Sequence, residues 1–272
     1  MADVYVRQAR GQFAGTVGST AISAGDLVYF DGTDWELADA DDSTKFAEAV
    51  AVASYATGAA GYFCRSCILV DTDAPYTQGD QYYLSATAGA HTATRPTGAN
   101  NLKQCVGFGL STSEVYVDIP PVREMHDYQP FTVNVAGTTA QLDSGNFAGQ
   151  VIDAADDDAF LTVQVPENYV GLEIAYMWLS AESLAATPTI NMFASGAADG
   201  EQWDATTVDN TLTATAGAGA AADEIQRTTV TTNFDAAGVA EPGNIIGLRC
   251  TKITGDTDPS MLFGVMFVWL VV

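Results

Sequence analysis

Basic residues are scarce in this chain of 272 residues, which has 10 lysines and arginines against 34 aspartates and glutamates. Lysine occurs only at Lys45, Lys103 and Lys252. A protein that binds nucleic acid needs a basic surface to displace the counterions of the phosphate backbone, and a surface that binds anionic lipid needs the same charge. With a formal net charge of -24, we expect neither partner.

Long apolar runs and a secretory leader are also missing. A transmembrane helix needs about 20 consecutive apolar residues, whereas the apolar run Met261–Val272 has only 12. Met1–Arg7 lacks the basic region and apolar core that open a signal peptide. We expect a protein that is made in a cytoplasm and not inserted in a membrane, with Met261–Val272 as a buried strand.

Histidine is rare, and the common catalytic motifs are missing. His91 and His126 are the two histidines, and neither lies in a GxSxG, HExxH, P-loop or GxGxxG pattern. Among 34 carboxylates, a pair at glycosidase spacing arises by chance and is no evidence for that chemistry. We therefore expect no enzymatic activity and name no catalytic residue.

The chain has few cysteines, and two of them have a spacing that is typical of a zinc half-site or a redox pair. They are Cys64 and Cys67, inside the segment Gly61–Val70, which we predict as one strand. Positions i and i+3 of a strand face opposite sides of the sheet. A zinc site would need Cys105 with His91 or Cys250. We favour small buried thiols and keep zinc as the alternative.

What the chain has in abundance is the composition of a folded β-protein. It is 47% hydrophobic and 10% aromatic, unlike a disordered acidic chain. Short apolar runs alternate with period two between glycine and aspartate turns, which predicts an all-β fold. The predicted strands are Asp26–Phe30, Trp35–Leu37, Glu48–Ala53, Gly61–Val70, Gln81–Leu84, Gln104–Leu110, Glu114–Ile119, Phe131–Val135, Gly149–Ile152, Ala159–Val165, Gly171–Ser180, Thr189–Ala194, Gln226–Thr232, Ile245–Thr254 and Met261–Val271.

Proline divides the chain into two domains. Three prolines between residues 120 and 130 predict a semi-rigid linker. Residues 1–20 have few core-forming side chains and are expected to be an extended arm that orders against a partner, with a frayed terminus or a first edge strand as the alternative. Between the arm and the linker, residues 21–119 are predicted to form a small β-barrel or β-sandwich. Residues 131–272 hold eight predicted strands, the number of a jelly-roll β-sandwich.

Two polar loops of the second half carry candidate binding residues. Four carboxylates within six residues favour a site for Ca²⁺ or another cation, although no EF-hand pattern surrounds them and a solvated turn is the alternative. No other cofactor is expected. Trp203 lies in a polar segment and is a candidate contact residue, unless its ring is buried over the edge of the sandwich. The candidate cation ligands are Asp153, Asp156, Asp157 and Asp158.

The first half carries an order of turns and strands that matches a known family. Ala24–Ala38 contains Gly-Asp-Leu-Val-Tyr-Phe-Asp-Gly, and Gln78–Thr92 contains Gly-Asp-Gln-Tyr-Tyr-Leu-Ser. Val106-Gly107 and Val115-Tyr-Val-Asp-Ile119 follow. Over about residues 20–119, this order resembles the capsid decoration (cement) and head-fibre proteins of tailed bacteriophages and their archaeal relatives.

The second half resembles the jelly-roll domains that such virion proteins carry outward. Phe160–Tyr169, Ile245–Lys252 and the closing apolar strand carry this likeness.

The resemblance implies a structural virion protein, made in the host cytoplasm, that decorates the exterior of a tailed-virus capsid as a cement or turret protein. Its implied partners are the major capsid protein and further copies of itself, as a trimer, pentamer or hexamer. The alternative is a tail-fibre or spike protein that binds a receptor or glycan on the host cell surface. A lectin-like module of a cell surface is a third reading, and the missing leader argues against it.

The excess of acid also predicts a halophilic source, because molar salt shortens the Debye length to about 3 Å and screens repulsion between surface carboxylates. We expect the melting temperature to rise between dilute buffer and molar NaCl, as followed by circular dichroism. Sucrose, which stabilises proteins without screening charge, is the control. A flat or falling melting temperature in NaCl would contradict the halophilic interpretation.

Overall fold

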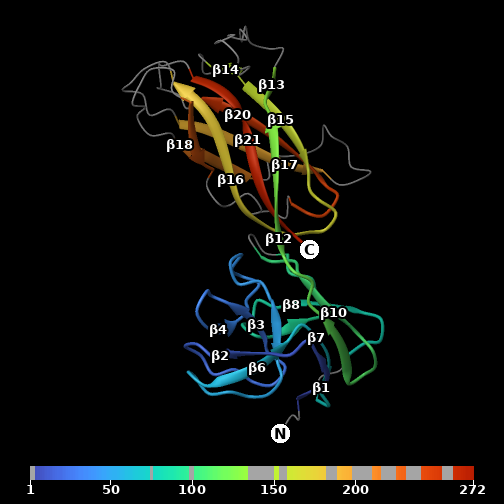
Figure 1. The fold of residues 1–272 in the computed structure, drawn as a ribbon. Coiled ribbons are helices and arrows are strands. Elements are labelled where there is room, and N and C mark those ends of the chain that lie inside the picture. The colour runs from blue at the N-terminus through green and yellow to red at the C-terminus, as the bar shows by residue number, and fades with distance from the viewer. Residues whose placement is uncertain are drawn as a thin grey trace. The chain divides into compact units, whose positions relative to one another are not determined.

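The computed structural model describes residues 4–73, 76–97, 101–133, 150–152, 158–181, 189–197, 210–215, 225–230, 240–252 and 260–272. Within these ranges the regular elements are strands, and the strands pair antiparallel, so the all-β prediction is confirmed. No helix in the same ranges is long and apolar enough to span a bilayer. The chain forms two compact units that meet in sequence at Arg123 and Glu124 (Figure 1).

The N-terminal unit consists of two antiparallel sheets. The six-stranded sheet has the order β1-β7-β11-β10-β8-β9, and the five-stranded sheet has the order β2-β6-β5-β3-β4. Their strands are β1 Tyr5–Arg10, β2 Phe13–Thr16, β3 Leu27–Phe30, β4 Trp35–Leu37, β5 Ala49–Ala51, β6 Ala60–Cys64, β7 Ser66–Val70, β8 Gln81–Leu84, β9 His91–Thr92, β10 Cys105–Gly109 and β11 Glu114–Asp118.

An aromatic cluster packs on one face of the five-stranded sheet. The rings of Trp35 and Phe63 stack with centroids 5.0 Å apart, and Phe13 lies 5.2 Å from Trp35. Gly15 lies directly beneath Trp35, and a Cβ there would collide with the indole ring. Offset aromatic pairs stabilise beyond their buried area, so this cluster fixes β2, β4 and β6 relative to one another.

The expected arm over residues 1–20 is wrong for the described part of that segment. β1 pairs with β7, and β2 pairs with β6. In β1, Val6 and Ala9 are half-buried and the other four residues are exposed. An edge strand of this kind is held by main-chain hydrogen bonds to a distant partner, so it lacks the apolar face that sequence patterns detect.

The C-terminal unit is a jelly-roll β-sandwich of two antiparallel sheets. One sheet has the order β12-β21-β16-β19, with β14 also paired to β21, and the other has the order β13-β15-β20-β17-β18. Their strands are β12 Arg123–Pro130, β13 Thr132–Val133, β14 Gln150–Ile152, β15 Asp158–Gln164, β16 Tyr169–Ala181, β17 Thr189–Ala197, β18 Asn210–Thr215, β19 Ile225–Thr229, β20 Ile245–Lys252 and β21 Ser260–Val271.

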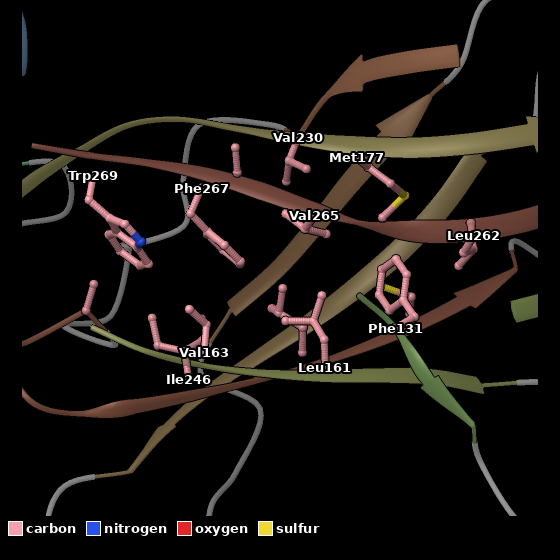
Figure 2. Packing of buried hydrophobic residues seen from close by; sticks show 14 of the residues in the cluster. Phe131, Leu161, Val163, Met177, Val230, Ile246, Leu262, Val265, Phe267 and Trp269 are labelled. Atoms are coloured by element: carbon pink, nitrogen blue, oxygen red, sulfur yellow. The ribbon is translucent and has the colours of Figure 1, made fainter. Parts of the chain in front are cut away.

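Apolar side chains from the two sheets of the sandwich meet in one core (Figure 2). β15 shows how the sequence specifies it, because its buried residues Ala159, Leu161 and Val163 alternate strictly with outward-facing ones. From the opposite sheet, Phe267 and Trp269 of β21 stack with ring centroids 5.2 Å apart. β21 lies between β12 and β16 and is buried along almost its whole length.

The linker predicted over residues 120–130 is correct only for its first residues. Residues 123–130 form β12 at the edge of a sheet of the sandwich. Pro130 is the last residue of this strand, where the missing amide donor is tolerated because an edge strand leaves half of its donors unpaired. Gly264 of β21 allows the close approach of β12, since a Cβ there would lie 2.6 Å from the Gln129 carbonyl oxygen.

Truncating Trp269 is expected to destabilise the sandwich strongly. It is fully buried, so Trp269→Ala should lower the free energy of unfolding by about 3–5 kcal/mol. Trp269→Phe should cost much less, because the phenyl ring keeps part of the packing. This variant also no longer buries an indole N–H that has no partner among the described residues. Urea unfolding measures both, with exposed Val272→Ala as the control. Equal costs for the two variants would contradict this account of the core.

Candidate functional site

A pocket opens in the N-terminal unit, where loops of the two sheets meet. Its volume is about 520 Å³, within the range of small-ligand sites. Polar side chains from four separate segments line it together with Val4, Leu69 and main-chain atoms. The polar residues are Ser23, Asp26, Ser54, Asp71, Tyr76 and His91.

Two glycines shape the walls of this pocket. Gly25 and Gly89 have φ values of +87° and +78°, a conformation that glycine adopts without strain. A Cβ on Gly25 would lie 2.6 Å from Leu69 Cδ1, and one on Gly89 would lie 2.9 Å from Leu37 Cδ2. The Leu27 amide donates to the Gly89 carbonyl at 2.8 Å, so the loop before β3 and the loop before β9 are held side by side.

His91 is the centre of a small aromatic group at one end of the pocket. Its Nε2 lies 3.0 Å from the Tyr76 hydroxyl, and its ring stacks on that of Tyr76 with centroids 5.6 Å apart. Tyr82 packs edge-on against both rings. Burial lowers the pKa of His91, and the charge of Asp71 offsets this only in part. Burial also raises the pKa of Tyr76, so at neutral pH the imidazole is uncharged and the phenol is protonated.

The pocket also contains two carboxylates. Asp26 Oδ2 accepts a hydrogen bond from the Ser23 amide at 2.7 Å. Burial raises the pKa of Asp26, and that hydrogen bond lowers it by less. Asp71 Oδ1 accepts from the Asp73 amide at 2.9 Å. None of the residues that line the pocket is a lysine or an arginine, so its potential is negative whenever either carboxylate is ionised.

The structure describes only one of the candidate binding residues predicted from the sequence. Asp153, Asp156, Asp157 and Trp203 are outside the described residues. Asp158 begins β15, opposite Thr251 of β20. In the described ranges, no group of three or more histidine, cysteine or acidic side chains is placed to hold a metal ion. His126 lies exposed on β12, with its Nε2 3.2 Å from Glu124 Oε2.

The CxxC pair differs from its predicted geometry. Arg65 separates β6 from β7, and these strands belong to different sheets, so Gly61–Val70 is not one strand. Cys64 and Cys67 are therefore both buried and hydrogen-bonded to each other instead of facing opposite sides. That hydrogen bond raises the pKa of Cys67, and burial raises it further. The favoured assignment as small buried thiols agrees with this environment, and all four cysteines are free.

Sequence reasoning missed the pocket as a site. Asp26 and His91 are 65 positions apart in the sequence, and the residues around His91 predict only a turn. The sequence offers only two glycines, Gly25 before Asp26 and Gly89 near His91, which indicate turns but not that the two turns lie side by side.

Comparisons with known proteins extend no further than the fold. A scan against protein-family models finds no match, and a search of curated proteins finds none either. A xylan-binding module, CBM15, is 13% identical, with 55% of this chain and 96% of that chain covered and a TM-score of 0.34.

Two further solved structures are equally distant. The CBM36-1 domain of a multidomain xylanase from the hindgut metagenome of Trinervitermes trinervoides is 9% identical, covering 53% of this chain and 96% of its own, with a TM-score of 0.31. A chain in the structure of infectious bursal disease virus, Gx strain, is 12% identical, covering 99% of this chain and 58% of its own, with a TM-score of 0.30. Similarity at this level assigns no ligand or partner to this chain.

Replacing His91 is expected to flatten the pH dependence of stability. The pKa of His91 is below the usual 6.5, so the unfolded chain binds a proton first as the pH falls. The wild type therefore loses stability below about pH 6.5, by up to about 1.4 kcal/mol per pH unit from this group. His91→Gln should remove that loss.

Urea unfolding between pH 7.5 and 5.5 checks this, with His126→Gln as the matched control on an exposed histidine. An NMR titration of the His91 imidazole gives an independent measure of its pKa. The assignment fails if the imidazole titrates above 6.5 or if His91→Gln keeps the wild-type slope.

Proposed function

We propose that this chain is a structural protein of a tailed-virus particle that binds the outside of the capsid and associates with copies of itself. The resemblance in sequence supports this, and its segments occur here as strand hairpins. Ala24–Ala38 contains the β3–β4 hairpin, and Gln78–Thr92 contains β8 and β9. A decoration protein needs a preformed binding surface and no catalytic group.

The observation that carries the proposal is the open edge that β1 gives to the six-stranded sheet of the N-terminal unit. β2 ends the order of the five-stranded sheet, where Val17 directly after it bridges Trp35 and the Gly18 amide donates to the Trp35 carbonyl at 2.9 Å. Unpaired main-chain groups on such edges can pair with a strand of another protein. Tyr5 on β1 is 48% exposed, and Tyr62 on β6, next to β2, is 57% exposed.

The two units also differ in their ratio of basic to acidic residues. Residues 1–123 hold seven of the 10 basic residues but only 14 of the 34 acidic ones. Three arginines, Arg7, Arg10 and Arg65, lie on β1 or directly before its partner β7. The remaining 20 acidic residues accompany three basic ones in residues 124–272. We propose that the N-terminal unit faces the shell and that the strongly acidic sandwich faces the solvent.

Attachment to the shell tests this surface directly. Buried tyrosines at interfaces often contribute 2 kcal/mol or more, which corresponds to about a 30-fold change in affinity. The full-length double variant Tyr5→Ser/Tyr62→Ser should therefore bind capsids that lack the protein at least about 30-fold more weakly, as measured by co-sedimentation in molar salt.

The matched control is Ile245→Ser, which changes a side chain that is 50% exposed on the sandwich. It should leave attachment unchanged. Weaker binding of Ile245→Ser with normal binding of the tyrosine variant would reverse the assigned roles of the two units. Copy number in purified particles separates the main alternative, since a shell protein is present in hundreds of copies and a tail fibre or spike in few.

A further inference from the structure

The pocket of the N-terminal unit is open to solvent on one side, and its walls are held by contacts between distant segments. Its floor is formed by Val4 and Leu69, which contact the position that a Cβ of Gly25 would take. Its rim is held by hydrogen bonds that join distant segments, such as Gly25 to the Ala51 carbonyl at 2.9 Å and the Ala24 amide to Ser54 Oγ at 3.0 Å.

Two carboxylates contribute hydrogen-bond acceptors to the pocket wall. Asp26 uses Oδ2 for the Ser23 amide, and its Oδ1 accepts no hydrogen bond from the described residues. Asp71 adds the second carboxylate. The contact of His91 with Tyr76 uses Nε2, so Nδ1 donates or accepts according to the tautomer of the ring. A ligand that pairs with the carboxylates must donate hydrogen bonds.

The charge of the pocket selects the sign of the ligand. Two aspartates line it, and no lysine or arginine does, so phosphates, carboxylates and other anions are disfavoured. Asp26 has no ion pair in the described structure and is partly desolvated, which is costly for a carboxylate unless a cation accompanies it. Since the described side chains include no set of three metal ligands, the fitting cation is an organic one with N–H donors.

We propose that this pocket binds an ammonium or guanidinium group, with the carboxylates of Asp26 and Asp71 as its ionic partners. The planar guanidinium presents five N–H donors, so it can bind a carboxylate through two hydrogen bonds and still donate to another acceptor. A site of this kind keeps its strength in concentrated salt better than a surface ion pair, because a pair in a cavity is screened less than an exposed one. The inference goes beyond the proposed attachment to a shell and does not depend on it.

A matched pair of probes tests the charge of the ligand on the full-length protein. Nα-acetyl-arginine amide and Nα-acetyl-citrulline amide have nearly the same shape, but only the first is a cation. In NMR titrations, the arginine probe should shift the signals of Asp26, Asp71 and His91 in a saturable way. The citrulline probe should bind at least about tenfold more weakly, which corresponds to about 1.4 kcal/mol. Equal binding of the two probes, or no binding of either, would overturn the proposal.

Variants identify the residues involved. Asp26→Asn should weaken binding of the arginine probe about tenfold or more, and Ser54→Phe should block the pocket from a different segment. Asp80→Asn is the control, because Asp80 is an exposed carboxylate of the same unit that does not line the pocket. Amide spectra of each variant show whether it is folded. If Asp80→Asn and the two pocket variants reduce binding equally, the effect is one of net charge and the proposal is wrong.

The source of the cation is identified by a second measurement. Capsid attachment of Asp26→Asn is compared with that of the wild type by co-sedimentation. If attachment falls together with binding of the arginine probe, the group is a basic side chain of the shell protein. If attachment is unchanged while probe binding falls, the pocket takes a free amine or guanidine. Both outcomes retain the site and differ only in what delivers the group.

Discussion

Burial of one face of every sheet is the constraint on which the rest of this structure depends. Along β15 the buried residues alternate with outward-facing ones without a break, and along β21 almost every residue is buried. Apolar area removed from water contributes about 25 cal/mol per Å², and repulsion among 34 acidic side chains opposes it. The cores therefore have to be continuous, and both units achieve this with two sheets.

The two proposed functional features lie where this alternation stops. Edge strand β1 pairs with a neighbouring strand on one side only, and the pocket lies among loops that precede β3 and β9. Side chains at such positions do not have to fill the apolar cores, so residues such as Tyr5, Asp26 and His91 can stand there without disrupting the sheets. Their geometry is nevertheless fixed, because the main chain around Gly25 and Gly89 is hydrogen-bonded to the sheets on both sides.

The sequence predicts central strands well and edges poorly, for one physical reason. β3, β8 and β11 lie inside their sheets and within a residue of their predicted ranges, since each shows local alternation or an apolar run. β1, β2 and β12 have mostly exposed side chains and owe their structure to hydrogen bonds with residues far along the chain. The sequence also does not reveal that the chain passes from one sheet to the other at Arg65. The residues on both sides of Arg65 are apolar, so β6 and β7 have the pattern of a single strand. The pocket needs a contact between Leu27 and Gly89, which no local pattern reports.

The distribution of charge differs between the two units through their basic residues. Acidic residues are spread almost evenly, with 14 in residues 1–123 and 20 in residues 124–272, whereas seven of the 10 basic residues lie in the first stretch. The N-terminal unit is closer to balance and places arginines on its edge strand and carboxylates inside its pocket. Its surface can therefore offer charges of both signs to a partner, at separate places. A contact built in this way has a defined orientation, because reversing it would bring like charges together.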